Sequence, residues 1–104
     1  MSAIKINKNN FESVSSDNRP VLVDFYADWC GACRYLSPVI DEIASENPEY
    51  FIAKVNVDEN PELASRFGIM SLPTLAVLKN GRLVQRSVGA KPKRQILRLI
   101  ESQL

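Results

Sequence analysis

The stretch VLVDFYADWCGAC, residues 21–33, decides the fold of this chain. Its first seven residues favour a β-strand and are apolar on both faces apart from Asp24, as expected of a strand buried between two layers. The two cysteines of the chain, Cys30 and Cys33, follow directly, where the pattern of a helix begins. A C-x-x-C between a strand and a helix indicates a redox motif.

The helix after this strand is predicted from about Gly31 to Glu46. Its apolar residues recur at three- and four-residue spacing, as on one face of an amphipathic helix: Leu36, Val39, Ile40, Ile43 and Ala44. Free backbone N–H groups at the start of a helix stabilise an anion, so we expect Cys30 to hold more thiolate than an ordinary cysteine and to be the nucleophile. Cys33, one turn deeper, is expected to be shielded and close enough to attack a mixed disulfide on Cys30.

Four further strands and three further helices are predicted on either side of this unit. The strands are expected at residues 3–6, 51–57, 74–78 and 83–88, and the helices after Asn9-Asn10, after Asn60 and after Pro92. Either Asn9 or Asn10 could cap its helix, and the last helix carries an apolar stripe of Ile96, Leu97, Ile100 and Leu104. Asn80-Gly81 predicts a tight hairpin, because both central residues of a type I′ turn need positive φ.

This order of elements predicts an α/β fold. Parallel crossovers followed by an antiparallel hairpin imply a central mixed sheet, flanked by helices on both faces. No linker, repeat or low-complexity segment divides the sequence, so we expect residues 1–104 to form a single domain.

Composition excludes several classes of function. The chain has 104 residues, a net charge of +1, two cysteines and no histidine. The near-neutral charge argues against nucleic acid as a partner. Without histidine, a histidine-dependent triad and a histidine-ligated metal site are excluded. No apolar run suits a signal peptide or a membrane span, so we expect a cytoplasmic protein with no membrane contact.

Two other interpretations of the cysteine pair remain at this point. A structural disulfide would close only four residues and so would stabilise the fold little, and it would be unusual in a reducing compartment. A zinc site needs about four ligands, of which this chain offers two thiolates plus carboxylates or a second subunit. The redox interpretation is therefore favoured over both.

The whole chain resembles the thioredoxin family. VDFYADWCGAC at residues 23–33, GIMSLPTL at 68–75, KNG at 79–81 and VGA at 88–90 match the signatures of that family in order and spacing. The resemblance implies the thioredoxin fold and general reduction of protein disulfides through a Cys30/Cys33 dithiol, without a bound cofactor. An oxidase or isomerase on the same scaffold, or a binding subunit whose groove matters more than its thiols, are the alternatives.

The resemblance also assigns roles to particular residues. Asp24 matches a buried acid that exchanges a proton with Cys33, and Lys54 matches a lysine near that acid. A lone buried carboxylate is costly unless its pKa rises or it finds a partner. Pro73 matches a cis-proline beside the thiols, and the backbone of Leu72 is expected to pair with an extended substrate segment. The expected substrate-binding residues are Trp29, Gly31, Ala32, Met70, Ser71, Leu72, Pro73 and Gly89.

Two positions depart from the usual pattern of the family. Ala32 stands where these proteins usually carry proline, and Tyr26 where many carry tryptophan. Alanine restores an N–H between the thiols, so we expect a modestly more oxidising protein that is still a reductant. The implied partners are a thioredoxin reductase, fed by NADPH or ferredoxin, and disulfide-containing protein substrates, and we expect the chain to act as a monomer.

Overall fold

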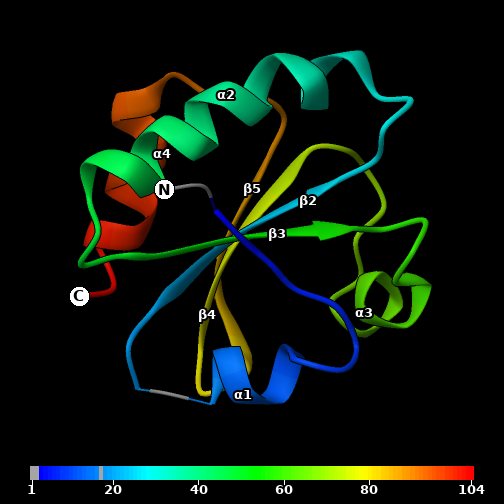
Figure 1. Ribbon diagram of the computed structural model, residues 1–104, viewed down its shortest axis with the longest axis horizontal. Coiled ribbons are helices and arrows are strands. Elements are labelled where there is room, and N and C mark those ends of the chain that lie inside the picture. Colours follow the sequence, from blue (N-terminus) through cyan, green and yellow to red (C-terminus); the bar gives the residue numbers. More distant parts are fainter. Residues whose placement is uncertain (1–2, 17) are drawn as a thin grey trace.

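The fold is built on one five-stranded sheet with the strand order β1-β3-β2-β4-β5 (Figure 1). A computed structural model describes residues 3–16 and 18–104, so Met1, Ser2 and Asp17 lie outside the described residues. The strands are β1 (Ile4–Lys5), β2 (Val21–Tyr26), β3 (Phe51–Asn56), β4 (Thr74–Lys79) and β5 (Arg82–Val88). The helices are α1 (Phe11–Ser15), α2 (Gly31–Glu46), α3 (Pro61–Arg66) and α4 (Lys93–Glu101).

The predicted strand at residues 21–27 is the centre of the sheet, as its apolar run suggests. β2 pairs with β3 in parallel and with β4 antiparallel. Asp24 lies opposite Lys54 on one side and opposite Leu75 on the other. The mixed sheet is confirmed, and it sets one carboxylate in the middle of the central strand.

Helices cover both faces of the sheet, as predicted. Side chains of α2 and α4 pack on the face that carries Leu22, and side chains of α1 and α3 pack on the face that carries Val21 and Val23. Figure 1 shows α2 and α4 together on one side of the strands and α1 and α3 on the other. Because side chains alternate along a strand, Asp24 points to the α2 side with Leu22.

Burial of large apolar side chains holds the layers together. Leu36, Ile40, Ile96 and Ile100 are at most 1% exposed on the α2 side of the sheet. Each such side chain contributes roughly 1.5–3 kcal/mol relative to an exposed one. The sheet is thereby fixed beneath α2, and the start of that helix is held at the end of β2.

Local predictions hold in most places. The hairpin between β4 and β5 turns at Asn80 and Gly81, whose φ angles are 53° and 75°, as a type I′ turn requires. Leu104, predicted in the stripe of the last helix, lies beyond α4 and is 67% exposed, because that helix ends at Glu101. Asn10 is the N-cap of α1, but its side-chain oxygen accepts from the N–H of Asn7 and not from the helix.

Candidate active site

The cysteine pair lies at the junction of β2 and α2. Cys30 is the N-cap residue of α2, and its Sγ accepts a hydrogen bond of 3.2 Å from the N–H of Cys33. The two residues form a disulfide, with their Cα atoms 5.2 Å apart. Cys30 is 8% exposed and Cys33 is 2% exposed, so the first sulfur is the more accessible one. The helix terminus thus offers a hydrogen-bond donor to the sulfur that we predict to be the nucleophile.

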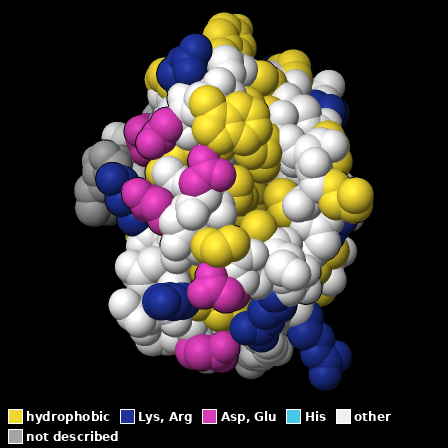
Figure 2. Space-filling model, turned by 90° about the vertical axis from the view of Figure 1, so that its right-hand side faces the viewer, with side chains coloured by type: hydrophobic (Ala, Val, Ile, Leu, Met, Phe, Trp, Pro, Cys, Tyr) yellow, Lys and Arg dark blue, Asp and Glu magenta, His cyan; other side chains and the backbone are white. Residues whose placement is uncertain are grey.

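Trp29 stands beside the thiols as a large exposed side chain. It is 68% exposed, and its Nε1–H donates a hydrogen bond of 2.8 Å to Asp58 Oδ2. Asp58 follows β3, so the bond ties the loop before α2 to the neighbouring strand end. Figure 2 shows hydrophobic side chains gathered on this face of the molecule, with acidic side chains beside them.

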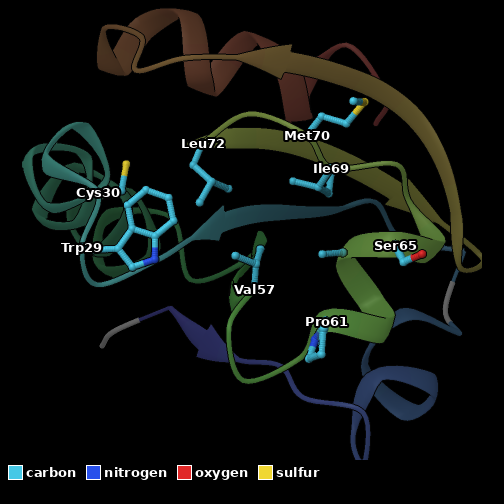
Figure 3. Close-up of a pocket in the computed structure, with 9 residues that line it drawn as sticks. Trp29, Cys30, Val57, Pro61, Ser65, Ile69, Met70 and Leu72 are labelled. Carbon is cyan, nitrogen blue, oxygen red and sulfur yellow. The ribbon is translucent and has the colours of Figure 1, made fainter.

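An apolar hollow of about 460 Å³ opens next to Cys30. Figure 3 shows the tryptophan and the first cysteine on one side of it and helix α3 on the other. Its lining residues come from four segments of the chain: Trp29, Cys30, Val57, Pro61, Ala64, Ser65, Ile69, Met70 and Leu72. Met70 is 95% exposed at its rim. The lining of the hollow is mostly apolar, and its volume lies within the range of roughly 300–1,000 Å³ that is usual for ligand-binding pockets.

The loop before β4 forms one wall of this hollow. The Leu72–Pro73 peptide bond is cis, as the resemblance predicts. Thr74 Oγ1 donates to the Ser71 carbonyl at 2.6 Å, and the Gly89 N–H donates to the Pro73 carbonyl at 2.8 Å. In residues 3–16 and 18–104, no backbone hydrogen bond involves Leu72. Its N–H and C=O thus have no backbone partner in that part of the chain.

Asp24 is buried without a hydrogen bond. It is 1% exposed, and neither carboxylate oxygen has a hydrogen-bond partner among the described residues. Burial raises the pKa of this carboxyl from 3.8 to about 7, because the charged form loses its hydration. The charge of Lys54 opposes the rise and that of Asp41 adds to it. Such a group can both accept and release a proton near neutral pH.

Lys54 does not bind the acid that it faces. Although it lies opposite Asp24 in the sheet, its Nζ donates to Ser37 Oγ at 2.6 Å and to Asp41 Oδ2 at 3.1 Å. Lys54 lies near the acid in the sheet, as the resemblance implies, but no hydrogen bond joins the two side chains. Helix α2 supplies nearer acceptors, which the sequence pattern alone does not indicate.

The predicted substrate-binding residues divide into two groups. Trp29, Met70 and Leu72 line the hollow. The others do not line it: Gly31 and Ala32 lie on the exposed first turn of α2, Ser71 is exposed, Pro73 is buried, and Gly89 supports Pro73.

The sequence reasoning missed the opposite wall of the hollow. Pro61, Ala64 and Ser65 belong to α3 and recur at a spacing of three and four residues. That spacing puts them on one helix face, away from the buried Leu63. In the sequence, these three positions show only as one face of small residues on a short helix, and such a face does not by itself indicate a binding site.

These features define a class of protein, a dithiol–disulfide oxidoreductase with its thiols at a helix N-terminus. Among the described residues, no three cysteine or acidic side chains gather as they would around a metal ion. No helix in that same part of the chain is long and apolar enough to cross a membrane.

Comparison with known proteins identifies the family. The Thioredoxin family model matches residues 2–102, and the chain belongs to the thioredoxin family. A thioredoxin of Alicyclobacillus acidocaldarius subsp. acidocaldarius is 50% identical over 88 residues, 84% of either chain. A bifunctional thioredoxin reductase/thioredoxin of Mycobacterium leprae (strain TN) is 49% identical over 89 residues, 85% of this chain and 19% of that protein.

A solved structure supports the same assignment. A single-substitution mutant of the thioredoxin from Halobacterium salinarum NRC-1 superposes with a TM-score of 0.88 at 40% identity, covering 98% of this chain and 90% of that one. The protein is therefore a thioredoxin-type disulfide reductase that works through the Cys30–Cys33 pair.

Proposed function

We propose that the reduced chain binds a disulfide-bearing protein over Trp29 and the Leu72–Pro73 edge and reduces it in two steps. The observation that carries this proposal is the position of Cys30 as the N-cap of α2, with the Cys33 N–H directed at its sulfur. The backbone N–H and C=O of Leu72, unpaired among the described residues, and the apolar hollow beside Cys30 support docking of an extended substrate segment at this edge. We assign Met70 and Ser71 to the same docking surface. We also assign substrate-binding roles to Gly31, Ala32 and Gly89, which lie outside the hollow.

In the first step, the Cys30 thiolate attacks one sulfur of the substrate disulfide. A bond forms between Cys30 Sγ and that sulfur, the substrate S–S bond breaks, and the other substrate sulfur leaves as a thiolate and takes up a proton. In the second step Cys33, deprotonated with the help of Asp24, attacks Cys30 Sγ. The bond between Cys30 Sγ and Cys33 Sγ forms, the bond from Cys30 Sγ to the substrate sulfur breaks, and that sulfur leaves as a thiolate and takes up a proton. The substrate is thus released with two thiols, and the chain is left with the Cys30–Cys33 disulfide.

Asp24 is the proposed proton acceptor for Cys33. Its pKa of about 7, raised by burial, matches a group that must take up a proton from a thiol and later return it. Lys54 acts on this exchange through its charge, since it forms no hydrogen bond to Asp24. Both residues face helix α2 from the sheet.

A reductase must return two electrons to the oxidised chain in each cycle. We assign this role to a thioredoxin reductase fed by NADPH or ferredoxin. The relative from Mycobacterium leprae, whose name joins the two activities, supports this partner. We further propose that the chain works as a monomer, as one domain over residues 1–104, in the cytoplasm, where thiols are kept reduced.

The order of attack can be tested by trapping. With a single-cysteine variant, Cys33→Ser, the reduced chain should accumulate a mixed disulfide between Cys30 and a protein substrate such as insulin, detectable by mass spectrometry. Cys30→Ser is the matched control and should trap little. Accumulation on Cys30→Ser, or none on Cys33→Ser, would contradict the proposed order.

The double variant Cys30→Ser, Cys33→Ser separates reduction from binding. Turnover of insulin with a matched reductase should be lost completely in this variant, since no thiol remains. If the double variant still performed a cellular function of the wild type, that function would depend on binding through the groove and not on disulfide reduction.

A further inference from the structure

Helix α2 carries a polar line beside its apolar stripe. Cys33, Ser37 and Asp41 follow one another at intervals of four residues, so they lie along one side of the helix. This side faces the sheet at the strands that carry Asp24 and Lys54, where Lys54 Nζ meets Ser37 and Asp41. The helix that presents the resolving thiol therefore also presents the acceptors of the buried lysine.

The position of the Lys54 ammonium is fixed by these acceptors. The Lys54 side chain is 11% exposed, and its hydrogen bonds to Ser37 Oγ and Asp41 Oδ2 measure 2.6 Å and 3.1 Å. Asp41 is itself held, because its Oδ1 accepts from the Ala3 N–H at 3.1 Å. The Asp41 carboxylate thus links the backbone at Ala3, next to the edge strand β1, to the Lys54 ammonium.

The same arrangement leaves Asp24 unpaired. Asp24 and Lys54 are register partners on neighbouring strands, yet neither oxygen of Asp24 receives a hydrogen bond from any described residue. A direct ion pair would hold a carboxylate ionised, since a hydrogen-bonded opposite charge favours the charged form. A lysine held by other acceptors attracts the carboxylate more weakly, through charge alone.

We propose that Ser37 and Asp41 are positioning residues that hold the Lys54 ammonium away from the Asp24 carboxylate, so that Asp24 can carry the proton that Cys33 gives up. This inference rests on the proposed role of Asp24 in the reaction. It adds two residues of α2 that lie outside the disulfide and the hollow. The proton affinity of the acid is thereby set from the helix that bears the thiols.

The charged and titratable groups around Asp24 are consistent with this assignment. Lys54 faces it from β3, Asp41 and Cys33 face the sheet from α2, and Tyr26 lies two residues along its own strand. Its partner on β4 is Leu75, which carries no charge. Burial sets the direction in which the pKa of Asp24 moves, and Lys54 and Asp41 act on it with opposite signs.

The test is a titration of Asp24 in full-length variants. In Asp41→Asn the amide keeps the shape of the side chain but removes its charge, and the lysine loses its anionic acceptor. The pKa of Asp24, followed by NMR of its carboxyl carbon in the oxidised protein, should fall by about one pH unit. Ser37→Ala should shift it in the same direction by less. Glu42→Gln, which removes an equal charge from the next residue of α2, is the control and should leave it unchanged.

A second readout separates this inference from the proposed reaction. The rate at which the mixed disulfide is resolved in single turnover should follow the titration of Asp24, and its midpoint should move down with Asp41→Asn. An unchanged pKa of Asp24 in both Asp41→Asn and Ser37→Ala, or an equal shift in Glu42→Gln, overturns the role of the two positioning residues. If Asp24→Asn keeps the wild-type pH profile of resolution, the proton acceptor of the proposed function is wrong, and this inference falls with it even where the NMR titration shifts.

Discussion

At the scale of single residues, Asp24 is a buried carboxyl group without a hydrogen-bond partner among the described residues. It lies in the middle of the central strand, 1% exposed, between Lys54 on one side and Leu75 on the other. A leucine there would complete the core at no desolvation cost. The buried carboxyl therefore lowers the stability of the fold, and its proposed role in proton transfer gives a reason for keeping it.

The cost of Asp24 should be visible as a dependence of stability on pH. Because its pKa is about 7 in the folded chain and near 3.8 when unfolded, the folded state binds the proton more tightly between these values. Its contribution is thus fully present below about pH 4 and is lost as pH rises through 7. The free energy of unfolding in urea should fall by roughly 3 kcal/mol more between about pH 5 and about pH 8 in wild type than in Asp24→Asn.

An exposed acid provides the control for this measurement. Glu49→Gln removes one carboxylate from an exposed position and should keep the wild-type slope. If Asp24→Asn retained the same decline of stability with pH as the wild type, burial of this carboxyl would not be its source.

At the scale of elements, the loop that precedes β4 is held from the outer strand. Arg86 of β5 donates from its guanidinium to the carbonyl oxygens of Phe67 and Gly68, the latter at 3.4 Å. Gly68 has a φ of +64°, where the chain turns out of α3 toward Ile69 and Met70. An arginine on the edge strand thus fixes the start of the segment that lines the hollow.

These hydrogen bonds from Arg86, which we call the clamp, should affect the reduction of protein substrates but not of small disulfides. Arg86→Leu removes charge-assisted hydrogen bonds to two carbonyls, so the loop is less well ordered for docking. We expect kcat/KM for insulin to fall about fivefold, mainly through KM, while reduction of a small aromatic disulfide stays unchanged.

Arg82→Leu is the matched control for the clamp. Arg82 is exposed on the same strand four residues earlier, and its side chain makes no hydrogen bond or ion pair to any described residue. An equal fall for both substrates, or the same loss in Arg82→Leu, would show that the effect comes from charge or folding and not from the loop.

At the scale of the whole molecule, periodicity and turn chemistry predict the fold well. The apolar run at residues 21–27 and the Asn80-Gly81 turn each depend on local rules, and both are where the sequence places them. The active-site cysteines are equally local, because a C-x-x-C needs only its position after a strand. Contacts between distant segments are different. Lys54 binds Ser37 and Asp41 and not its register partner Asp24, and this preference depends on how α2 lies on the sheet.

The two layers of the core predict a fold that does not depend on the redox state of its thiols. One apolar cluster joins α2 and α4 to the sheet, a second joins α1 and α3 to the opposite face, and the cysteines belong to neither. A carrier that cycles between dithiol and disulfide needs this independence. Closing a loop of four residues stabilises a protein by only about 2 kcal/mol in loop-entropy models.

Both redox states should therefore unfold cooperatively in urea. The oxidised chain should be more stable than the reduced one by about 2 kcal/mol, with similar m-values because the same surface is exposed on unfolding. Cys30→Ser, Cys33→Ser is the control and should match the reduced wild type. A reduced chain without a cooperative transition, or a difference above about 4 kcal/mol, would mean that the disulfide holds the core together and that the two apolar clusters do not suffice.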